Sequence, residues 1–185
     1  MTLISSMPSL RPGDLERLEH EGGVEFVNGK LVGKPLSAEA ARIISTITRL
    51  LGNAAAQSGL ASVFNESLAY RCFAEDATKV RKPDVSVMRK ERLVGFDERS
   101  GFMPIPADLA VEVLSPTDRV YDVGDKVEEY LQNGFGVVWV VDPNARTTTV
   151  NQANSPALIV GEEDDIGCGS LLPTFRHKVK EFFAP

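Results

Sequence analysis

The chain has 185 residues and a mass of 20.1 kDa, which is enough for one substantial hydrophobic core, so we expect a single domain over residues 1–185. Its net charge of −6 and pI near 5.0 differ from those of proteins that coat nucleic acid non-specifically. The two cysteines are far apart and lack CxxC spacing, which argues against a zinc site and a disulfide framework.

The chain also lacks the apolar segments that direct proteins to membranes. No stretch approaches the roughly 18 consecutive apolar residues of a transmembrane helix. Residues 1–12 lack the basic start and apolar centre of a secretory signal. We therefore expect a cytoplasmic protein that does not bind membranes and that begins with a flexible N-terminus over residues 1–12.

The N-terminal part predicts a short helix followed by a β-hairpin. The helix, over residues 14–20, ends at two glycines. Asn28-Gly29 then separates two short apolar segments, residues 24–27 and 30–33. Asn and Gly accept the positive φ angles of a type I′ turn, so this is a strong hairpin signal.

A long helix and a series of strands follow. Ser37 can cap a helix whose isoleucines and leucines recur at helical spacing until Gly59. Strands are predicted at 61–64, 67–73 and 84–88, with a glycine- and proline-containing connection over residues 91–107.

The C-terminal half alternates strands with one more helix. The predicted elements are a strand at 109–114, a helix at 121–133, a strand at 137–141, a turn at 142–145 and strands at 147–151 and 157–160. The conformation of residues 179–183 stays open. A strand, a crossover helix and another strand predict a mixed sheet with helices on its faces, which is an α/β or α+β architecture.

Glu112 is the most informative residue because it interrupts the apolar strand at residues 109–114. A strand of this composition is typically covered on both faces, and a carboxylate there loses its hydration unless a partner compensates. The partner could be a metal ion, a proton retained on the carboxyl group, or a cation such as Arg119 or Lys126 in a purely structural ion pair.

Asp84 is the second candidate. It follows Pro83 and begins a predicted strand, so an alternative role is simply to start that strand. If this strand lies beside that of Glu112, the two carboxylates converge, and two close carboxylates need a cation between them. Mg²⁺ commonly uses one or two protein carboxylates together with water and phosphate oxygens.

Lys126 is the third candidate and borders the apolar stripe of the helix that follows the Glu112 strand. In a metal site its ammonium would orient the attacking water or stabilise charge on a phosphoryl group. The competing interpretation is a pair of helix-surface ion pairs with Asp122 and Glu129.

Several blocks of sequence, taken in order, carry a family resemblance. They are Val24-Glu25-Phe26-Val27-Asn28-Gly29, then Pro83-Asp84, then Glu112-Val113-Leu114-Ser115-Pro116, then Arg119, Asp122, Lys126 and Tyr130, and finally Trp139-Val140-Val141-Asp142-Pro143. This order resembles the Uma-type restriction endonucleases of the PD-(D/E)XK nuclease superfamily, and it spans about residues 14–183.

The resemblance implies a restriction-endonuclease-like fold, in which helices flank a mixed central sheet and β-hairpins lie toward both ends of the chain. It also implies hydrolysis of DNA phosphodiester bonds that depends on Mg²⁺ or Mn²⁺. Asp84, Glu112 and the Val113 carbonyl would hold the ion. The superfamily's lysine usually stands two residues after the acid, where this chain has Leu114, so its role would pass to Lys126.

The resemblance also draws attention to Glu25, which matches an acid in the family's opening hairpin and would be a further catalytic contact to the metal or the water. From its position alone, Glu25 would be an exposed residue of a hairpin. Exposed apolar strands in the hairpins make a homodimer plausible. The alternative function is a catalytically inactive nuclease fold that acts as an oligomeric binding or scaffold module, which the net acidity and the missing short-spaced lysine favour.

Overall fold

The computed structural model describes residues 24–33, 36–97, 99, 101–116 and 118–184. The expected flexible terminus over residues 1–12 and the expected helix over residues 14–20 lie outside this part of the chain. Among the helices of the described residues, none is long and apolar enough to cross a membrane.

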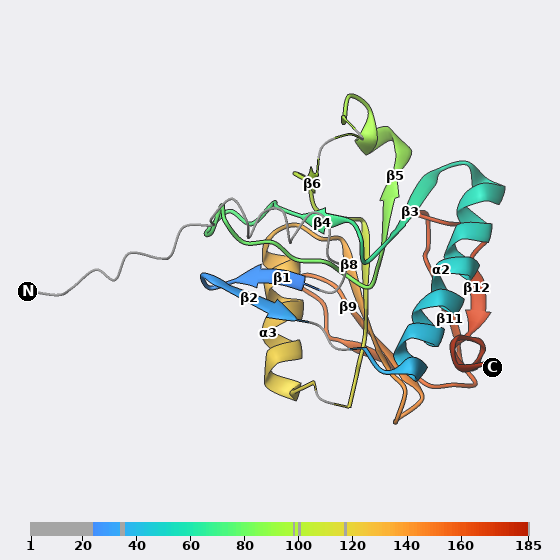
Figure 1. The fold of residues 1–185 in the computed structure, drawn as a ribbon. Helices are drawn as coiled ribbons and strands as arrows, with labels where there is room; N and C mark the ends of the chain where they lie inside the picture. Colours follow the sequence, from blue (N-terminus) through green and yellow to red (C-terminus); the bar gives the residue numbers. More distant parts are fainter. Residues whose placement is uncertain (1–23, 34–35, 98, 100, 117, 185) are drawn as a thin grey trace, which may run out of the picture.

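A six-stranded mixed sheet forms the centre of the fold, with one long helix on each face (Figure 1). Its order is β10-β9-β8-β7-β5-β3. The helices are α2 (Ala38–Ser58) and α3 (Val120–Gln132); the strands are β3 (Ala61–Asn65), β5 (Val85–Arg89), β7 (Leu109–Val113), β8 (Val137–Asp142), β9 (Thr147–Asn151) and β10 (Leu158–Val160). This arrangement confirms the expected mixed sheet flanked by helices.

The two middle pairings of the sheet determine where the acidic residues lie. β7 and β8 are parallel, because α3 carries the chain back between them, whereas β5 and β7 are antiparallel with Val85 opposite Val111. Side chains alternate between the faces of a strand. Val111 and Val113 therefore pack in the cluster under α2, whereas Ala110 packs in the cluster under α3, and Glu112 shares the face of Ala110.

The β1–β2 hairpin (Val24–Val27 and Lys30–Gly33) forms at the predicted turn. Asn28 and Gly29 have φ angles of 51° and 75°, which are the left-handed values that the sequence predicts. The hairpin is held against the chain at Phe26, whose backbone exchanges hydrogen bonds of 3.0 and 2.8 Å with Val80. This attachment brings β1 alongside α3 (Figure 1).

Helix α2 begins and ends where its capping residues predict. The Ser37 side chain accepts a hydrogen bond of 3.1 Å from the backbone N–H of Ala40, and Gly59 ends the helix with a φ of 69°. Ile43, Ile47 and other apolar residues of α2 pack on the sheet together with Trp139. Trp139 also contacts the rings of Phe175 and Phe182 near the C-terminus, at centroid distances of 5.8 and 6.2 Å.

Several elements differ from the sequence expectations. β4 covers only Ala69–Tyr70, shorter than the predicted strand at 67–73, and it pairs in parallel with β6 (Phe102–Met103), inside a segment expected to be a connection. Short helical turns occupy Lys90–Leu93 (η1) and Val179–Phe183 (η2). β11 (Asp165–Gly167) and β12 (Arg176–Lys178) form a further hairpin that the sequence did not predict.

Candidate active site between the sheet and helix α3

Glu112 lies on the sheet face covered by α3, and two side chains of that helix bind its carboxylate. Its side chain is buried, and both carboxylate oxygens accept hydrogen bonds from α3. Lys126 Nζ donates to Oε2 at 2.9 Å, and Tyr130 Oη donates to Oε1 at 2.9 Å. Lys126 and Tyr130 are four residues apart and so lie on one face of the helix.

Asp84 lies beside Glu112 because β5 is the antiparallel neighbour of β7. Continuing the register of Val85 opposite Val111 by one residue places Asp84 opposite Glu112. Asp84 is 1% exposed, and its Oδ2 accepts a hydrogen bond of 2.7 Å from the backbone N–H of Val113. The Asp84 carboxylate is thereby tied to the residue that follows Glu112.

Glu25 is buried in the same region, which corrects the expectation of an exposed hairpin residue. It is 2% exposed because docking of the β1–β2 hairpin turns its side chain toward α3. Glu25 Oε1 accepts hydrogen bonds from the backbone N–H of Lys82 at 2.9 Å and lies 3.1 Å from Lys126 Nζ. Its Oε2 accepts a hydrogen bond of 3.0 Å from Arg81.

Lys126 is therefore shared between two buried carboxylates, at 2.9 Å from Glu112 and 3.1 Å from Glu25. The interpretation of Lys126 as a surface residue paired with Asp122 and Glu129 is wrong. Asp122 is exposed, and Glu129 forms its ion pairs with Lys79 and Arg81. The alternative of Arg119 as the partner of Glu112 is not supported either, because Arg119 is exposed at the N-terminal end of α3.

Arg81 extends this network and was not a sequence candidate. Its Nη1 donates to Glu25 and its Nε donates to Glu129 Oε2 at 2.7 Å, while Lys79 pairs with the other oxygen of Glu129. Burial would lower the pKa of Arg81, but the Glu25 and Glu129 carboxylates raise it above its ordinary value. Arg81 therefore joins β1 to α3 as a permanent cation.

Two more buried residues in the region were not among the predicted site residues, although Tyr130 is part of the family resemblance. Lys82 is 1% exposed, and its backbone N–H is one of the donors to Glu25. Burial raises the pKa of the Tyr130 hydroxyl well above its usual value, and the Glu112 and Glu25 carboxylates raise it further, so this hydroxyl remains a protonated donor. Tyr130 could have been found as the residue one helical turn after Lys126, but no sequence signal separates Arg81 and Lys82 from the neighbouring bases.

The donor chemistry of this region suits a small divalent cation. Glu25 and Glu112 share the Lys126 ammonium, Asp84 lies opposite Glu112, and carboxylate oxygens are the protein ligands that Mg²⁺ prefers. In the part of the chain that the structure describes, no group of three or more His, Cys, Asp or Glu side chains is placed so that it could hold a metal ion. Two carboxylates are nevertheless sufficient for an ion that keeps several water ligands.

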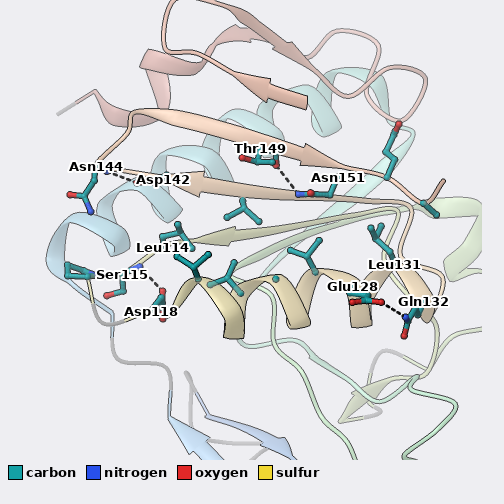
Figure 2. A pocket seen from close by; sticks show the side chains of 18 of the residues that line it. Leu114, Ser115, Asp118, Glu128, Leu131, Gln132, Asp142, Asn144, Thr149 and Asn151 are labelled. Carbon is teal, nitrogen blue, oxygen red and sulfur yellow. Dashed lines mark hydrogen bonds between the residues drawn. The ribbon is translucent and has the colours of Figure 1, made fainter. Parts of the chain in front are cut away.

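A cavity of about 960 Å³ lies between α3 and strands β8 and β9 (Figure 2). Its labelled side chains include Leu114, Leu131 and Asn151, and none of Glu25, Asp84, Glu112 or Lys126 lines it. Asp118, Glu128 and Asp142 line it, whereas none of its described lining residues is Lys or Arg. This cavity is therefore poorly suited to phosphate groups.

The chain matches one family model, and its fold is similar to that of a solved structure. The model of the Uma2 family, described as "Putative restriction endonuclease", matches residues 12–178. The fold is similar to the crystal structure of a "putative nuclease belonging to DUF820" from Anabaena variabilis, with a TM-score of 0.77, 21% sequence identity, and coverage of 95% of this chain and 98% of that one. No match was found among curated proteins. Because the family model spans most of the chain, this protein belongs to the Uma2 restriction endonuclease family.

Proposed function

We propose that the protein is a metal-dependent endonuclease that hydrolyses DNA phosphodiester bonds at the site between β5, β7 and α3. The observation that carries this proposal is that two buried carboxylates, Glu25 and Glu112, share the ammonium of Lys126, while a third, Asp84, lies opposite Glu112 on the neighbouring segment of chain. Burying that many charges is costly, and proteins seldom retain such groups without a functional reason.

We assign the acidic residues to metal binding and Lys126 to the water or the phosphate. Asp84, Glu112 and the Val113 carbonyl would hold Mg²⁺ or Mn²⁺. When bound, the ion supplies activation of a water molecule and stabilises negative charge at the phosphate. Lys126 is close enough to Glu112 to orient that water or to neutralise charge on the phosphate oxygens.

Glu25 would support Lys126 from the opposite side. The Glu25 carboxylate holds the ammonium at 3.1 Å and is itself held by Arg81 and by the backbone N–H of Lys82. In this arrangement Lys126 keeps Glu25 as a carboxylate partner when Glu112 binds the metal ion. Lys126 would thus stand in for the lysine that the superfamily carries two residues after the acid, where this chain has Leu114.

One observation favours the alternative, a catalytically inactive scaffold. Lys126 pairs with Glu112 and Glu25, and Arg81 pairs with Glu25 too, so both carboxylates already have cationic partners within the chain. Metal binding would require Lys126 to release Glu112. The two functions therefore differ in whether a divalent cation competes successfully with this ammonium.

The test is cleavage of supercoiled plasmid with Mg²⁺, Mn²⁺ or EDTA, comparing the wild type with Glu112→Gln. We expect nicked and linear products only with a divalent ion, and a loss of at least about 100-fold in Glu112→Gln, as is typical when an electrostatic group of an active site is removed. Glu163→Gln is the matched control, because Glu163 is exposed and pairs with Lys180 at 2.7 Å, outside the site. Equal, metal-independent products from all three proteins would reject the proposal, and binding without cleavage would support the scaffold.

We further propose a cytoplasmic enzyme that acts as a homodimer. Leu158 and Ile159 on the edge strand β10 are 62% and 68% exposed, and an edge strand has unpaired backbone groups with which a second copy could pair. Sedimentation velocity of the purified protein tests the dimer: a single species at the monomer mass at micromolar concentration would reject it.

A further inference from the structure

One face of α3 holds both oxygens of Glu112, but it does so with two different kinds of donor. Lys126 reaches Oε2 at 2.9 Å, and Tyr130 reaches Oε1 at 2.9 Å. The Lys126 side chain is 12% exposed and has a second carboxylate partner in Glu25. Tyr130 is fully buried. The two oxygens of Glu112 are therefore unequal in how readily they can change partner.

The Tyr130 hydroxyl is a rigid donor because the aromatic ring that carries it is clamped. The ring packs against Phe135 with a centroid distance of 4.5 Å and against Phe73 at 6.4 Å. In a close-packed interior a ring held in this way cannot tilt without displacing its neighbours. Only rotation about the C–O bond remains free, so the hydroxyl oxygen stays at one place relative to Glu112.

Lys126, by contrast, can leave Glu112 at low cost. Its ammonium ends a flexible four-carbon chain, and Glu25 Oε1 at 3.1 Å keeps it neutralised if the contact with Glu112 is lost. Breaking the Tyr130 contact would leave a buried hydroxyl without its acceptor, which is costly. Oε2 is thus the oxygen of Glu112 that can accept a new cation.

We propose that Tyr130 is a positioning residue for the metal ligand Glu112: its hydroxyl holds Oε1, so that Glu112 presents Oε2 alone to the divalent cation. This inference rests on the proposed function and extends it. A residue in this role does not touch the substrate or the ion, but it fixes the direction of a ligand. Removing such a partner typically weakens metal affinity or activity by about 10- to 100-fold.

The chain contains a matched control for this role. Tyr70 is also 0% exposed, contacts the same Phe135 ring at 5.3 Å, and donates its hydroxyl hydrogen bond to Ser86 Oγ at 2.8 Å. Its acceptor is a neutral hydroxyl instead of the carboxylate of Glu112. Tyr130→Phe and Tyr70→Phe therefore each remove one buried hydroxyl from one aromatic cluster, and only the first removes a contact with Glu112.

The experiment measures the dissociation constant for Mn²⁺ by calorimetry on the folded wild type and both variants. We expect Tyr130→Phe to bind Mn²⁺ about 10- to 100-fold more weakly and Tyr70→Phe to bind it within about twofold of the wild type. In cleavage assays, Tyr130→Phe should need more Mn²⁺ for half-maximal rate, a change that lost stability alone would not produce. Equal affinities in all three proteins, or equal losses in both variants, would overturn the positioning role.

Crystal structures of the two variants without metal keep this inference separate from the proposed function. We expect the Glu112 carboxylate to rotate in Tyr130→Phe and to keep its position in Tyr70→Phe. If the wild type binds no Mn²⁺ and cleaves no DNA, the proposed function fails, and the Glu112 conformation alone decides whether Tyr130 positions it. An unchanged Glu112 in Tyr130→Phe would then refute the inference.

Discussion

Replacing Arg81 with Met tests whether the buried charge network stabilises the fold. Arg81 is the cation that joins β1 to α3, with contacts of 3.0 Å to Glu25 and 2.7 Å to Glu129. Its side chain is 13% exposed, so water screens these contacts weakly. Met retains much of the apolar stem of Arg and removes the charge and the five donors.

The expected loss of stability depends on which cationic partners Glu25 and Glu129 keep in the variant. Removing one partner of a buried ion pair typically costs about 3–5 kcal/mol, because the other charge is left uncompensated. Here Glu25 keeps Lys126, and Glu129 keeps Lys79. We therefore expect the free energy of unfolding to fall by about 2–3 kcal/mol, at or just below the lower end of that range.

Urea unfolding followed by circular dichroism at neutral pH gives this free energy from the midpoint and slope. The matched control is Arg176→Met, which removes an Arg–Asp pair of 2.8 Å to Asp165 in which the arginine side chain is 77% exposed. Exposed ion pairs contribute little, so the control should unfold almost as the wild type does. If Arg81→Met loses no more stability than Arg176→Met, the reasoning that burial makes this network stabilising is wrong.

Three further predictions concern other parts of the chain. Lys126→Met should abolish metal-dependent cleavage. Added Mn²⁺ should nevertheless raise the midpoint of thermal unfolding more for this variant than for the wild type, because two buried carboxylates then lack their shared ammonium. An equal increase in the two proteins would contradict this. Gly136→Ala should lower the free energy of unfolding by about 1–3 kcal/mol, because the added Cβ would lie 2.6 Å from a backbone carbonyl oxygen. Gly124→Ala should instead raise it by about 0.5–1 kcal/mol, because Gly124 lies within α3 with open space around the added Cβ. Equal urea midpoints for the two variants would refute the packing argument. Burial raises the pKa values of the Cys72 and Cys168 thiols to about 12, so both should react with Ellman's reagent at pH 8 far more slowly in the native protein than in guanidinium; equal rates would show that the thiols are not shielded.

Features that depend on neighbours in the chain could be predicted from the sequence. The turn at Asn28-Gly29 requires positive φ angles that these two residues accept, and Ser37 and Gly59 cap α2 through contacts within one helical turn. The apolar run at 109–114 predicted a strand, and Glu112 was identified as a candidate because a carboxylate in such a run violates the ordinary pattern. The crossover helix between the strands at 109–114 and 137–141 predicted a mixed sheet, and the structure pairs these strands, β7 and β8, in parallel.

The partners of the charged side chains were decided only by the tertiary structure. Arg81 contacts Glu25 across 56 residues of sequence and Glu129 across 48, and no periodicity relates such positions. Glu25 became buried only because Phe26 and Val80 attach the hairpin beside α3. A short strand such as β11 or β12 likewise has too few residues to show an alternating pattern, so its pairing appears only when the chain is folded. Local chemistry thus determined the elements and the unusual acid, whereas long-range packing determined which charges neutralise one another, since that depends on distances that exist only in the folded state.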